Sequence, residues 1–456
     1  MPGREPSTRL YRCISRLALA AAFAAASLGV EAQDLLQVYR DAQRYDAQYA
    51  SARAALEAGR EKLPQGRALL LPSLTLDASA NATNFDSKTR DQTLGPALTF
   101  DRNARVTNYQ FTLTQPIFRL QNWAQFNQSE QQVKQAEATF GRAYQDLMTR
   151  AAQAYFDVLA AQDTLALVRA QKEAISEQLA QAKRNFEVGT ATITDTHEAQ
   201  ARYDLSVSQE IAAQNDLENK RRALQLITGK EYPALRGLRP DIKLAPPNPN
   251  DMQAWVDLAE KQSYTVIFQE AAAEIARLDV KRNNAAHLPT VDLVGSYGTL
   301  GQSATATTQI GSDITTSTIG LRLSVPLYSG GGLNSRDREA AALYLKQRDD
   351  LENERRNAAL AARQAYLSVI NGIAQVNALE QARVSSQSAL DSNKLGYEVG
   401  VRINIDVLNA QQQLYSTERD LAVARYNTIT NLLKLKAAAG ALRDEDLEEV
   451  NRALAL

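Results

Sequence analysis

Two stretches of the chain read FEVGTATITDTHEAQ (residues 186–200) and YEVGVRINIDVLNAQ (residues 397–411). They lie about 210 positions apart, and both contain a Glu-Val-Gly step followed by an aspartate, Asp195 in the first copy and Asp406 in the second. Similarity of this length at such a distance indicates that the chain contains two copies of one structural plan.

Further matches in the same order extend the repeat in both directions. They pair Leu71-Pro72-Ser73 with Leu288-Pro289-Thr290, Gln115-Pro116-Ile117-Phe118 with Val325-Pro326-Leu327-Tyr328, Gln153-Ala154-Tyr155 with Gln364-Ala365-Tyr366, and Thr228-Gly229 with Ala439-Gly440. We therefore predict one structural repeat over residues 33–228 and a second over 263–440. A proline-rich linker that ends in a short helix is expected at 229–262, and a C-terminal tail at 441–456.

The N-terminus has the composition of an export signal. An apolar run, Leu17 to Val30, ends near the small residue Ala32 and is preceded by four arginines, Arg4, Arg9, Arg12 and Arg16. This order predicts a signal peptide over residues 1–32; a short transmembrane anchor is the alternative, although the run is short for a membrane span. The only cysteine, Cys13, would leave with the signal, so no disulfide is expected. A formal net charge of -1 gives no reason to expect a nucleic-acid partner.

Each repeat contains two segments in which apolar and polar residues alternate. The apolar positions are Leu74, Leu76 and Ala78, then Tyr109, Phe111 and Leu113, then Val291, Leu293 and Tyr297, then Ile319, Leu321 and Leu323. A period of two predicts strands with one apolar and one polar face. We expect polar loops between them at about 84–104 and 299–315.

Long helices are predicted after each pair of strands, because residues 120–188 and 333–399 contain no proline. At 1.5 Å per residue each would be roughly 100 Å long, and such a helix must pack along its length as in a coiled coil. Gly189 and Gly400 suit the C-terminal ends of these helices.

Shorter helices complete each repeat. They are expected at about 34–69 and 263–287 before the strands, and at 195–228 and 404–439 after the tips. Asp195 suits the N-cap of the helix that it begins.

Four strands are too few to close a barrel, since about eight is the practical minimum. Strands of about ten residues with apolar and polar faces are nevertheless typical of outer-membrane barrels. The sequence therefore predicts that several chains pool their strands, and three chains would supply twelve. A soluble sandwich buried beneath the helices is the alternative interpretation.

The chain resembles the TolC family of outer-membrane channel-tunnels through essentially all of its sequence after the signal. The resemblance rests on QVYRDA, HLPTVDL, LSVPLYSGG, FEVGTATITD, YEVGVRINIDVLNAQ and ARYNTITNLLKLKAAAGAL, which are specific only in combination. It implies a mainly α-helical homotrimer with a twelve-stranded transmembrane β-barrel in outer-membrane lipid and a long coiled-coil helical barrel in the periplasm of a Gram-negative bacterium.

The resemblance also implies a function. Members of the family are exit ducts for tripartite efflux pumps and for type I protein secretion. They dock to a periplasmic adaptor (membrane fusion) protein and to an inner-membrane transporter, either an efflux pump or an ABC exporter, and they catalyse no reaction. Whether drugs or secreted proteins pass is left open by the sequence.

By motif match, the resemblance implies a latch that closes the periplasmic entrance. Tyr397 and Arg402 would be its inner residues, with Thr194 and Asp195 of a neighbouring coil or chain as partners. Asp406 would form the pore constriction together with position 409, where the family pattern has a second aspartate and this chain has Asn409. A trimer would then carry three carboxylates at its mouth rather than six.

Simpler interpretations of these residues remain open. Asp406 can serve only to cap the last helix, and Arg402 with Asp195 can be a surface ion pair worth under about 1 kcal/mol. His197-Glu198 has no second ligand at metal-binding spacing, and we predict no metal, no cofactor and no enzyme activity. The alternative function is that of a structural coiled-coil protein of the envelope that does not conduct.

Overall fold

The computed structural model describes residues 32–89, 98–239, 242–304 and 310–455. The predicted signal peptide lies outside the described residues except for Ala32. The chain divides into two compact units. The first comprises Ala143–Ala259 with the described residues up to Ser51 and from Ala359 onward, and the second comprises Ala52–Arg142 and Glu260–Ala358. Each unit therefore draws equivalent segments from both repeats.

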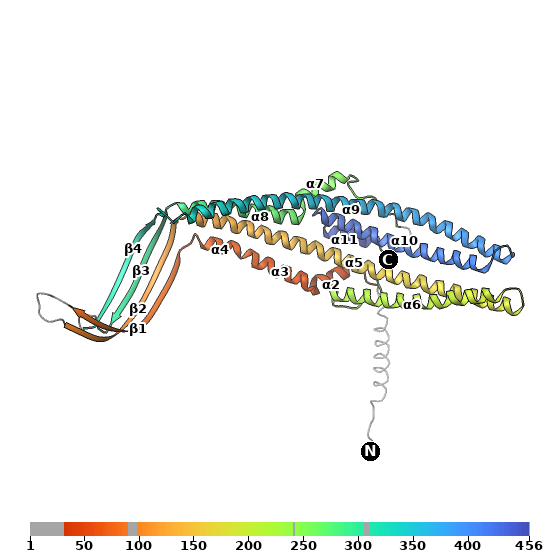
Figure 1. Cartoon of the computed structure of the whole chain (residues 1–456), viewed down its shortest axis with the longest axis horizontal. Helices are drawn as coiled ribbons and strands as arrows, with labels where there is room; N and C mark the ends of the chain where they lie inside the picture. Colours follow the sequence, from red (N-terminus) through yellow and green to blue (C-terminus); the bar gives the residue numbers. More distant parts are fainter. Residues whose placement is uncertain (1–31, 90–97, 240–241, 305–309, 456) are drawn as a thin grey trace, which may run out of the picture. The chain divides into compact units, whose positions relative to one another are not determined.

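The second unit holds a single antiparallel sheet in the order β1-β2-β3-β4 (Figure 1). Its strands are β1 (Ser73–Thr89), β2 (Leu98–Phe118), β3 (Thr290–Gln302) and β4 (Ser312–Ser324). The strands extend into both regions that the sequence analysis assigned to loops, so the loop predictions were too long. Polar residues do not end a strand when its backbone is paired, and β1 and β2 stay in register as far as Thr89 opposite Leu98.

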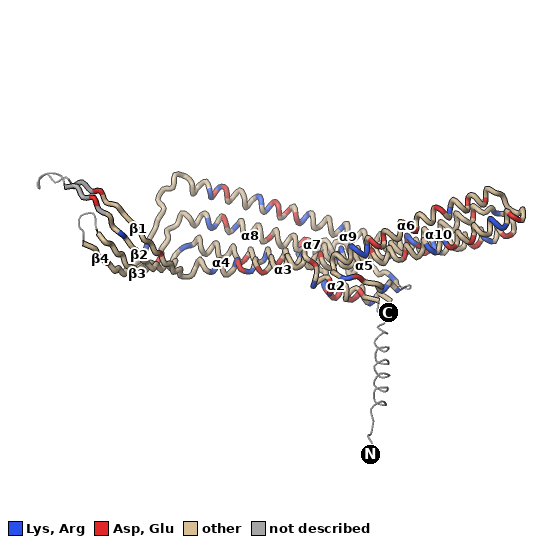
Figure 2. The backbone as a smooth tube through the Cα atoms, turned by 90° about the horizontal axis from the view of Figure 1, so that it is seen from below, with Lys and Arg blue, Asp and Glu red and all other residues tan. Residues whose placement is uncertain are grey.

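One face of the sheet is apolar across neighbouring strands. Leu76 lies opposite Phe111, and Phe111 lies opposite Tyr297. Residues directly opposite each other share a face, and these three side chains are 57%, 46% and 57% exposed. The strands carry few charges, whereas the helices carry both signs along their length (Figure 2). The predicted alternation thus appears as an apolar surface that no described residue of this unit covers.

An ion pair joins the sheet to the long helix that follows it. Arg119, between β2 and α5 (Leu120–Glu187), donates from Nε and Nη2 to the two carboxylate oxygens of Asp292 on β3, at 2.8 and 2.6 Å. Asp292 is only 3% exposed. A two-point contact of this kind fixes direction as well as distance, so it orients the start of α5 relative to β3.

Three further helices of the second unit pack closely against α5. They are the end of α3 (Ala47–Arg60), α4 (Lys62–Ala68) and α8 (Tyr264–Asn284), which is followed by a short 3₁₀ turn (Ala285–His287). A β-carbon added at Gly59 would lie 2.3 Å from the β-carbon of Ala136. The absence of a side chain at Gly59 therefore allows the close approach of α3 to α5.

Two helical hairpins make up much of the first unit, although the long helix of each hairpin begins in the second unit (Figure 1). The first pairs α5 with α6 (Ile193–Thr228), and the second pairs α9 (Gly332–Glu398) with α10 (Asn404–Ala438). Their bounds lie within two residues of the predicted ones. In the part of the chain that the structure describes, no helix is both long and apolar enough to cross a membrane.

The helix that begins the first repeat and the helix that follows the second repeat pack into the same hydrophobic core. It holds Leu35 and Val38 from α2 (Leu35–Tyr45) and Leu447 and Val450 from α11 (Asp444–Arg452). The predicted tail, residues 441–456, therefore contains a packed helix. The linker contributes α7 (Met252–Gln262) and two isolated backbone bridges, Gln33 with Leu235 and Leu238 with Leu454.

A half-buried carboxylate, that of Asp163, lies where α5 meets α10. The Tyr426 hydroxyl donates to Oδ2 of Asp163 at 2.6 Å, and the Tyr426 ring stacks on Phe156. Burial raises the pKa of Asp163, and the hydrogen bond from Tyr426 only partly opposes this rise. The ionised form of Asp163 is therefore less stable in the folded chain than in the unfolded one.

Asp163→Asn should stabilise the protein at neutral pH, because the amide removes a partly desolvated charge and keeps an acceptor for Tyr426. We expect the free energy of unfolding to rise on the order of 1 kcal/mol. The gain should shrink as the pH falls through the raised pKa of Asp163, and vanish below about 4, the ordinary aspartate pKa. Thermal unfolding followed by circular dichroism over a pH series measures this, with the exposed Asp391→Asn as control. A loss of stability at pH 7 would contradict the prediction.

Candidate entrance at the hairpin tips

Each hairpin turns at a tip, which we define as residues 188–192 for the first and 399–403 for the second. At the first tip the amide of Gly189 donates to the carbonyl of Phe186 at 3.0 Å, and that of Thr190 donates to the carbonyl of Asn185 at 2.8 Å. Gly189 has φ +77°. Crossed hydrogen bonds around a left-handed residue form a Schellman motif, which satisfies the last carbonyls of a helix.

The second tip has the same geometry. The amide of Gly400 donates to the carbonyl of Tyr397 at 3.1 Å, and that of Val401 donates to the carbonyl of Gly396 at 2.9 Å. Gly400 has φ +78°. The sequence similarity between residues 186–200 and 397–411 therefore corresponds to two turns with the same backbone conformation. Both glycines lie where the sequence predicts the helices to end.

The two aspartates that follow the tips have different local roles. Thr192, not Asp195, is the N-cap of α6, so that prediction was wrong. The Thr192 hydroxyl accepts from the amide of Asp195, and the Asp195 carboxylate accepts from the amide of Thr192 at 3.0 Å. This reciprocal arrangement is a capping box. Asp406 occupies the same helical position in α10, but there the N-cap is Ile403, which has no side-chain acceptor.

The predicted latch residues make different contacts within one chain. Nη1 of Arg402 lies 3.6 Å from Oδ2 of Asp406, and the Tyr397 hydroxyl accepts a hydrogen bond from Nδ2 of Asn185 at 3.3 Å. Among the residues that the structure describes, no hydrogen bond or ion pair joins Tyr397 or Arg402 to Thr194 or Asp195. Thr194 is exposed, so its side chain is accessible to a second chain.

Near the tips, α10 packs on one side against its own hairpin partner α9 and on the other against the first hairpin. On one side Leu408 packs with Ile175 and Leu179 of α5. On the other side Val407 packs with Leu390 of α9, and Tyr397 lies against this cluster. The ring of Tyr397 is therefore supported by α10, and its hydroxyl reaches the first hairpin.

A buried polar contact between the hairpins, not predicted from the sequence, lies near the tips. Nε2 of Gln178 donates to Oδ1 of Asn404 at 2.6 Å, and Asn404 is 1% exposed. Gln178 lies beside Leu179 on the otherwise apolar stripe that also holds Ile175, and a polar residue at such a position was the signal available in the sequence. Because a buried polar group must find a partner, this contact fixes the register of α10 against α5.

Asn409 also contacts the first hairpin. Its Oδ1 accepts from Nη2 of Arg202 on α6 at 2.9 Å, and Oε1 of Gln412 accepts from Nη1 of the same guanidinium at 2.6 Å. Asn409 and Gln412 are three residues apart, so they share a helix face. Asn409 is exposed, and the sequence analysis had no reason to associate it with Arg202.

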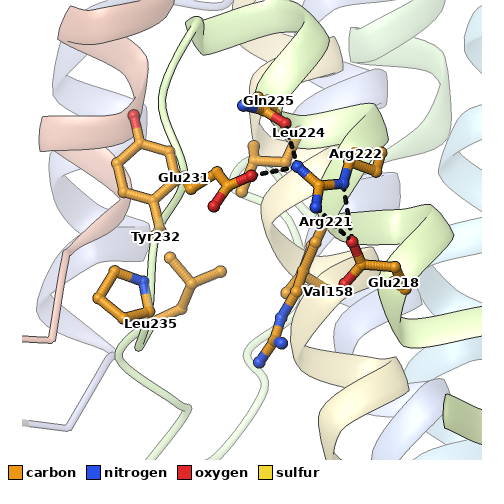
Figure 3. Close-up of a pocket in the computed structure, with 10 residues that line it drawn as sticks. Val158, Glu218, Arg221, Arg222, Leu224, Gln225, Glu231, Tyr232 and Leu235 are labelled. Carbon is orange, nitrogen blue, oxygen red and sulfur yellow. Dashed lines mark hydrogen bonds and ion pairs between the residues drawn. The ribbon is translucent and has the colours of Figure 1, made fainter.

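A surface pocket lies far along α6 from the tips, beside the linker (Figure 3). Its walls include Val158, Leu235 and the ring of Tyr232. The guanidinium of Arg222 is held by Glu218 and Glu231. The two acids thus hold Arg222, whereas the Nε of Arg221, which also lines the pocket, is buried without a hydrogen-bond partner among the described residues. Within residues 32–89, 98–239, 242–304 and 310–455, no cluster of three or more His, Cys, Asp or Glu is arranged to hold a metal ion.

The whole repeat matches a known family and known structures. The model of the family described as "Outer membrane efflux protein" matches residues 38–230 and 255–441. The outer membrane protein TolC of Vibrio cholerae is 34% identical over 440 residues, covering 96% of this chain and 98% of that protein. The proteases secretion protein PrtF of Dickeya chrysanthemi is 32% identical, covering 92% and 91% respectively.

The fold is shared with a solved structure. The outer membrane protein VceC of Vibrio cholerae matches with a TM-score of 0.75 and 21% identity, covering 89% of this chain and 96% of that chain. The two segments that the family model matches end at residues 230 and 441. These positions directly follow Gly229 and Gly440, where the two repeats end. By its repeated hairpins, its four-stranded sheet and these similarities, the chain belongs to the outer membrane efflux protein family.

Proposed function

We propose that three copies of this chain form an exit duct in the outer membrane, with a gated entrance made by the hairpin tips in the periplasm. Each chain would add four strands to a barrel of twelve, and the long helices would line the periplasmic part of the duct. The outer-membrane location and the general role in efflux or secretion follow from the family; the gate and its residues are our proposal.

The exposed apolar face of the sheet carries this proposal. Leu321 and Ile319 on β4 are 70% and 78% exposed. Exposure of apolar side chains to water costs free energy, and contact with lipid would remove that cost. Both ends of the sheet are also open, since within the described residues β1 pairs only with β2 and β4 only with β3. Long unpaired edge strands require a partner, and the edges of neighbouring chains can satisfy each other.

At the entrance, Tyr397 and Arg402 would close the duct against Thr194 and Asp195 of a neighbouring chain, in addition to their contacts within the chain. Asp406 would form a ring of three carboxylates. Such contacts are individually weak at an exposed site, so an adaptor can release them by binding at the tips.

The partners follow from the same proposal. A periplasmic adaptor would join the tips to an inner-membrane transporter that supplies the energy, because the chain has no nucleotide-binding loop of its own. One of its relatives is named as a proteases secretion protein, and the family name refers to efflux. Both secreted proteins and small toxic compounds are therefore candidate substrates.

A deletion strain tests the function. Loss of the gene should increase sensitivity to hydrophobic drugs and detergents, abolish export of a secreted protein, or both, and a plasmid copy should restore each trait. Which trait is lost identifies the substrate class. A strain with full drug resistance, full secretion and only an altered envelope would favour the structural alternative, which the family match does not support.

A further inference from the structure

Arg202 contacts α10 near the entrance, and the gate proposed above gives this contact no role. Arg202 lies in the early part of α6, and its two terminal nitrogens donate separately, to Asn409 at 2.9 Å and to Gln412 at 2.6 Å. A planar guanidinium can engage two acceptors at once, and a lysine ammonium cannot reproduce that geometry. The contact therefore joins the first hairpin to the second at two points.

The acceptors of Arg202 are neutral. Some cations of the first unit are matched by acids, as Arg402 is by Asp406 and Arg169 by Glu210. Others, such as Lys434, donate to an amide oxygen as Arg202 does. Within the described part of the chain, Arg202 has no carboxylate partner within ion-pair distance, so its positive charge is not compensated by its own contacts. Its acceptor Asn409 lies three residues after Asp406, on the same face of α10.

We propose that Arg202 is a further closing residue of the entrance, which ties α6 to α10 through two amide side chains and places an uncompensated positive charge beside the aspartate ring. This inference rests on the proposed function. It predicts two separable effects. The two-point hydrogen bond of the guanidinium, which we call the fork, holds the two hairpins together. The positive charge of Arg202 weakens the binding of cations at the mouth.

Two substitutions separate these effects. Arg202→Gln removes the fork and the charge, whereas Arg202→Lys removes the fork and keeps the charge. In trimers reconstituted in planar bilayers, both should raise the fraction of time in open states, by about three- to tenfold for a lost charge-assisted contact at an exposed site. Only Arg202→Gln should lower the concentration of hexamminecobalt(III) that blocks half the current, by about threefold. In that variant no positive charge at position 202 opposes the attraction of the cation to the ring of Asp406 carboxylates.

Arg222→Gln is the matched control, because Arg222 lies on α6 near the linker. It should leave opening and block unchanged. A second arm keeps Arg202 and replaces both acceptors, Asn409→Leu with Gln412→Leu. This variant should open like Arg202→Gln and block like the wild type, and it tests the tie even if Arg202→Gln fails to assemble.

Each outcome decides between the proposals. If wild-type trimers conduct but Arg202→Gln and the double acceptor variant behave like Arg222→Gln, the role of Arg202 is wrong and the duct stands. If Arg202→Lys reproduces the wild type in both measurements, charge alone acts and the tie is wrong. If wild-type trimers do not conduct, the proposed function itself fails, and the role of Arg202 with it.

Discussion

Replacing Tyr397 by Phe and Arg402 by Ser in the same chain should raise the mean single-channel conductance of reconstituted trimers several-fold. The double variant loses the hydrogen bond from Asn185 to Tyr397 and the contact of Arg402 with Asp406. It also loses the proposed contacts with a neighbouring chain. Two weak contacts of roughly 0.5–1 kcal/mol each, repeated in three chains, are enough to shift a closed population by more than tenfold.

Phenylalanine is chosen at 397 because the ring packs near Leu390 and Val407, so only the hydroxyl is lost. The matched control is Tyr366→Phe with Arg419→Ser in the same hairpin but away from its tip. There Tyr366 of α9 donates to Asn250, and Arg419 of α10 contacts Asp420. Conductance equal to the wild type in the test variant, or equal gains in test and control, would count against the latch.

Asn409→Asp should make the entrance far more sensitive to block by multivalent cations. A trimer would then hold six carboxylates on the face that Asp406 shares with position 409 instead of three. We expect the half-blocking concentration of hexamminecobalt(III) to fall by about tenfold, the order of change that one or two added charges produce at short range. Current recorded at increasing cation concentration measures this.

Arg202 refines this expectation. An aspartate at 409 would receive the Nη2 donor that now lies 2.9 Å from Asn409, so part of its charge would be neutralised. Asn409→Asp combined with Arg202→Gln should therefore be blocked at a lower concentration than Asn409→Asp alone. Asn427→Asp, farther along α10, is the control. Equal block in wild type and Asn409→Asp would mean that position 409 does not face the pore.

The local features of this fold could be predicted from the sequence. Gly189 and Gly400 both adopt the left-handed conformation expected at a helix end, and the alternation at Leu74 and Leu76 appears as an exposed apolar face. Backbone preference and period-two alternation act within a few residues, so a single sequence is enough to detect them.

The contacts between the repeats could not be predicted in the same way. Thr192 and Asp195 are both good capping residues, and only the fold shows that Thr192 begins the helix while Asp195 completes the box. The partner of Asn409 is Arg202, roughly two hundred residues away in the chain. Which long side chains meet depends on the register of α10 against α5. The packing of Leu408 and the buried contact of Gln178 with Asn404 set that register together. That register is a product of tertiary packing, and no local pattern encodes it.

The measurement that tests the central claim most directly is the current through the purified wild-type protein in a planar lipid bilayer. The protein should be extracted from outer membranes as a trimer, sized in detergent, and added to one side of the bilayer. The pooled four-stranded sheets predict discrete, small conductance steps that increase in the Tyr397→Phe, Arg402→Ser variant. Trimers that insert but stay silent, in the wild type and in this variant alike, would contradict the account.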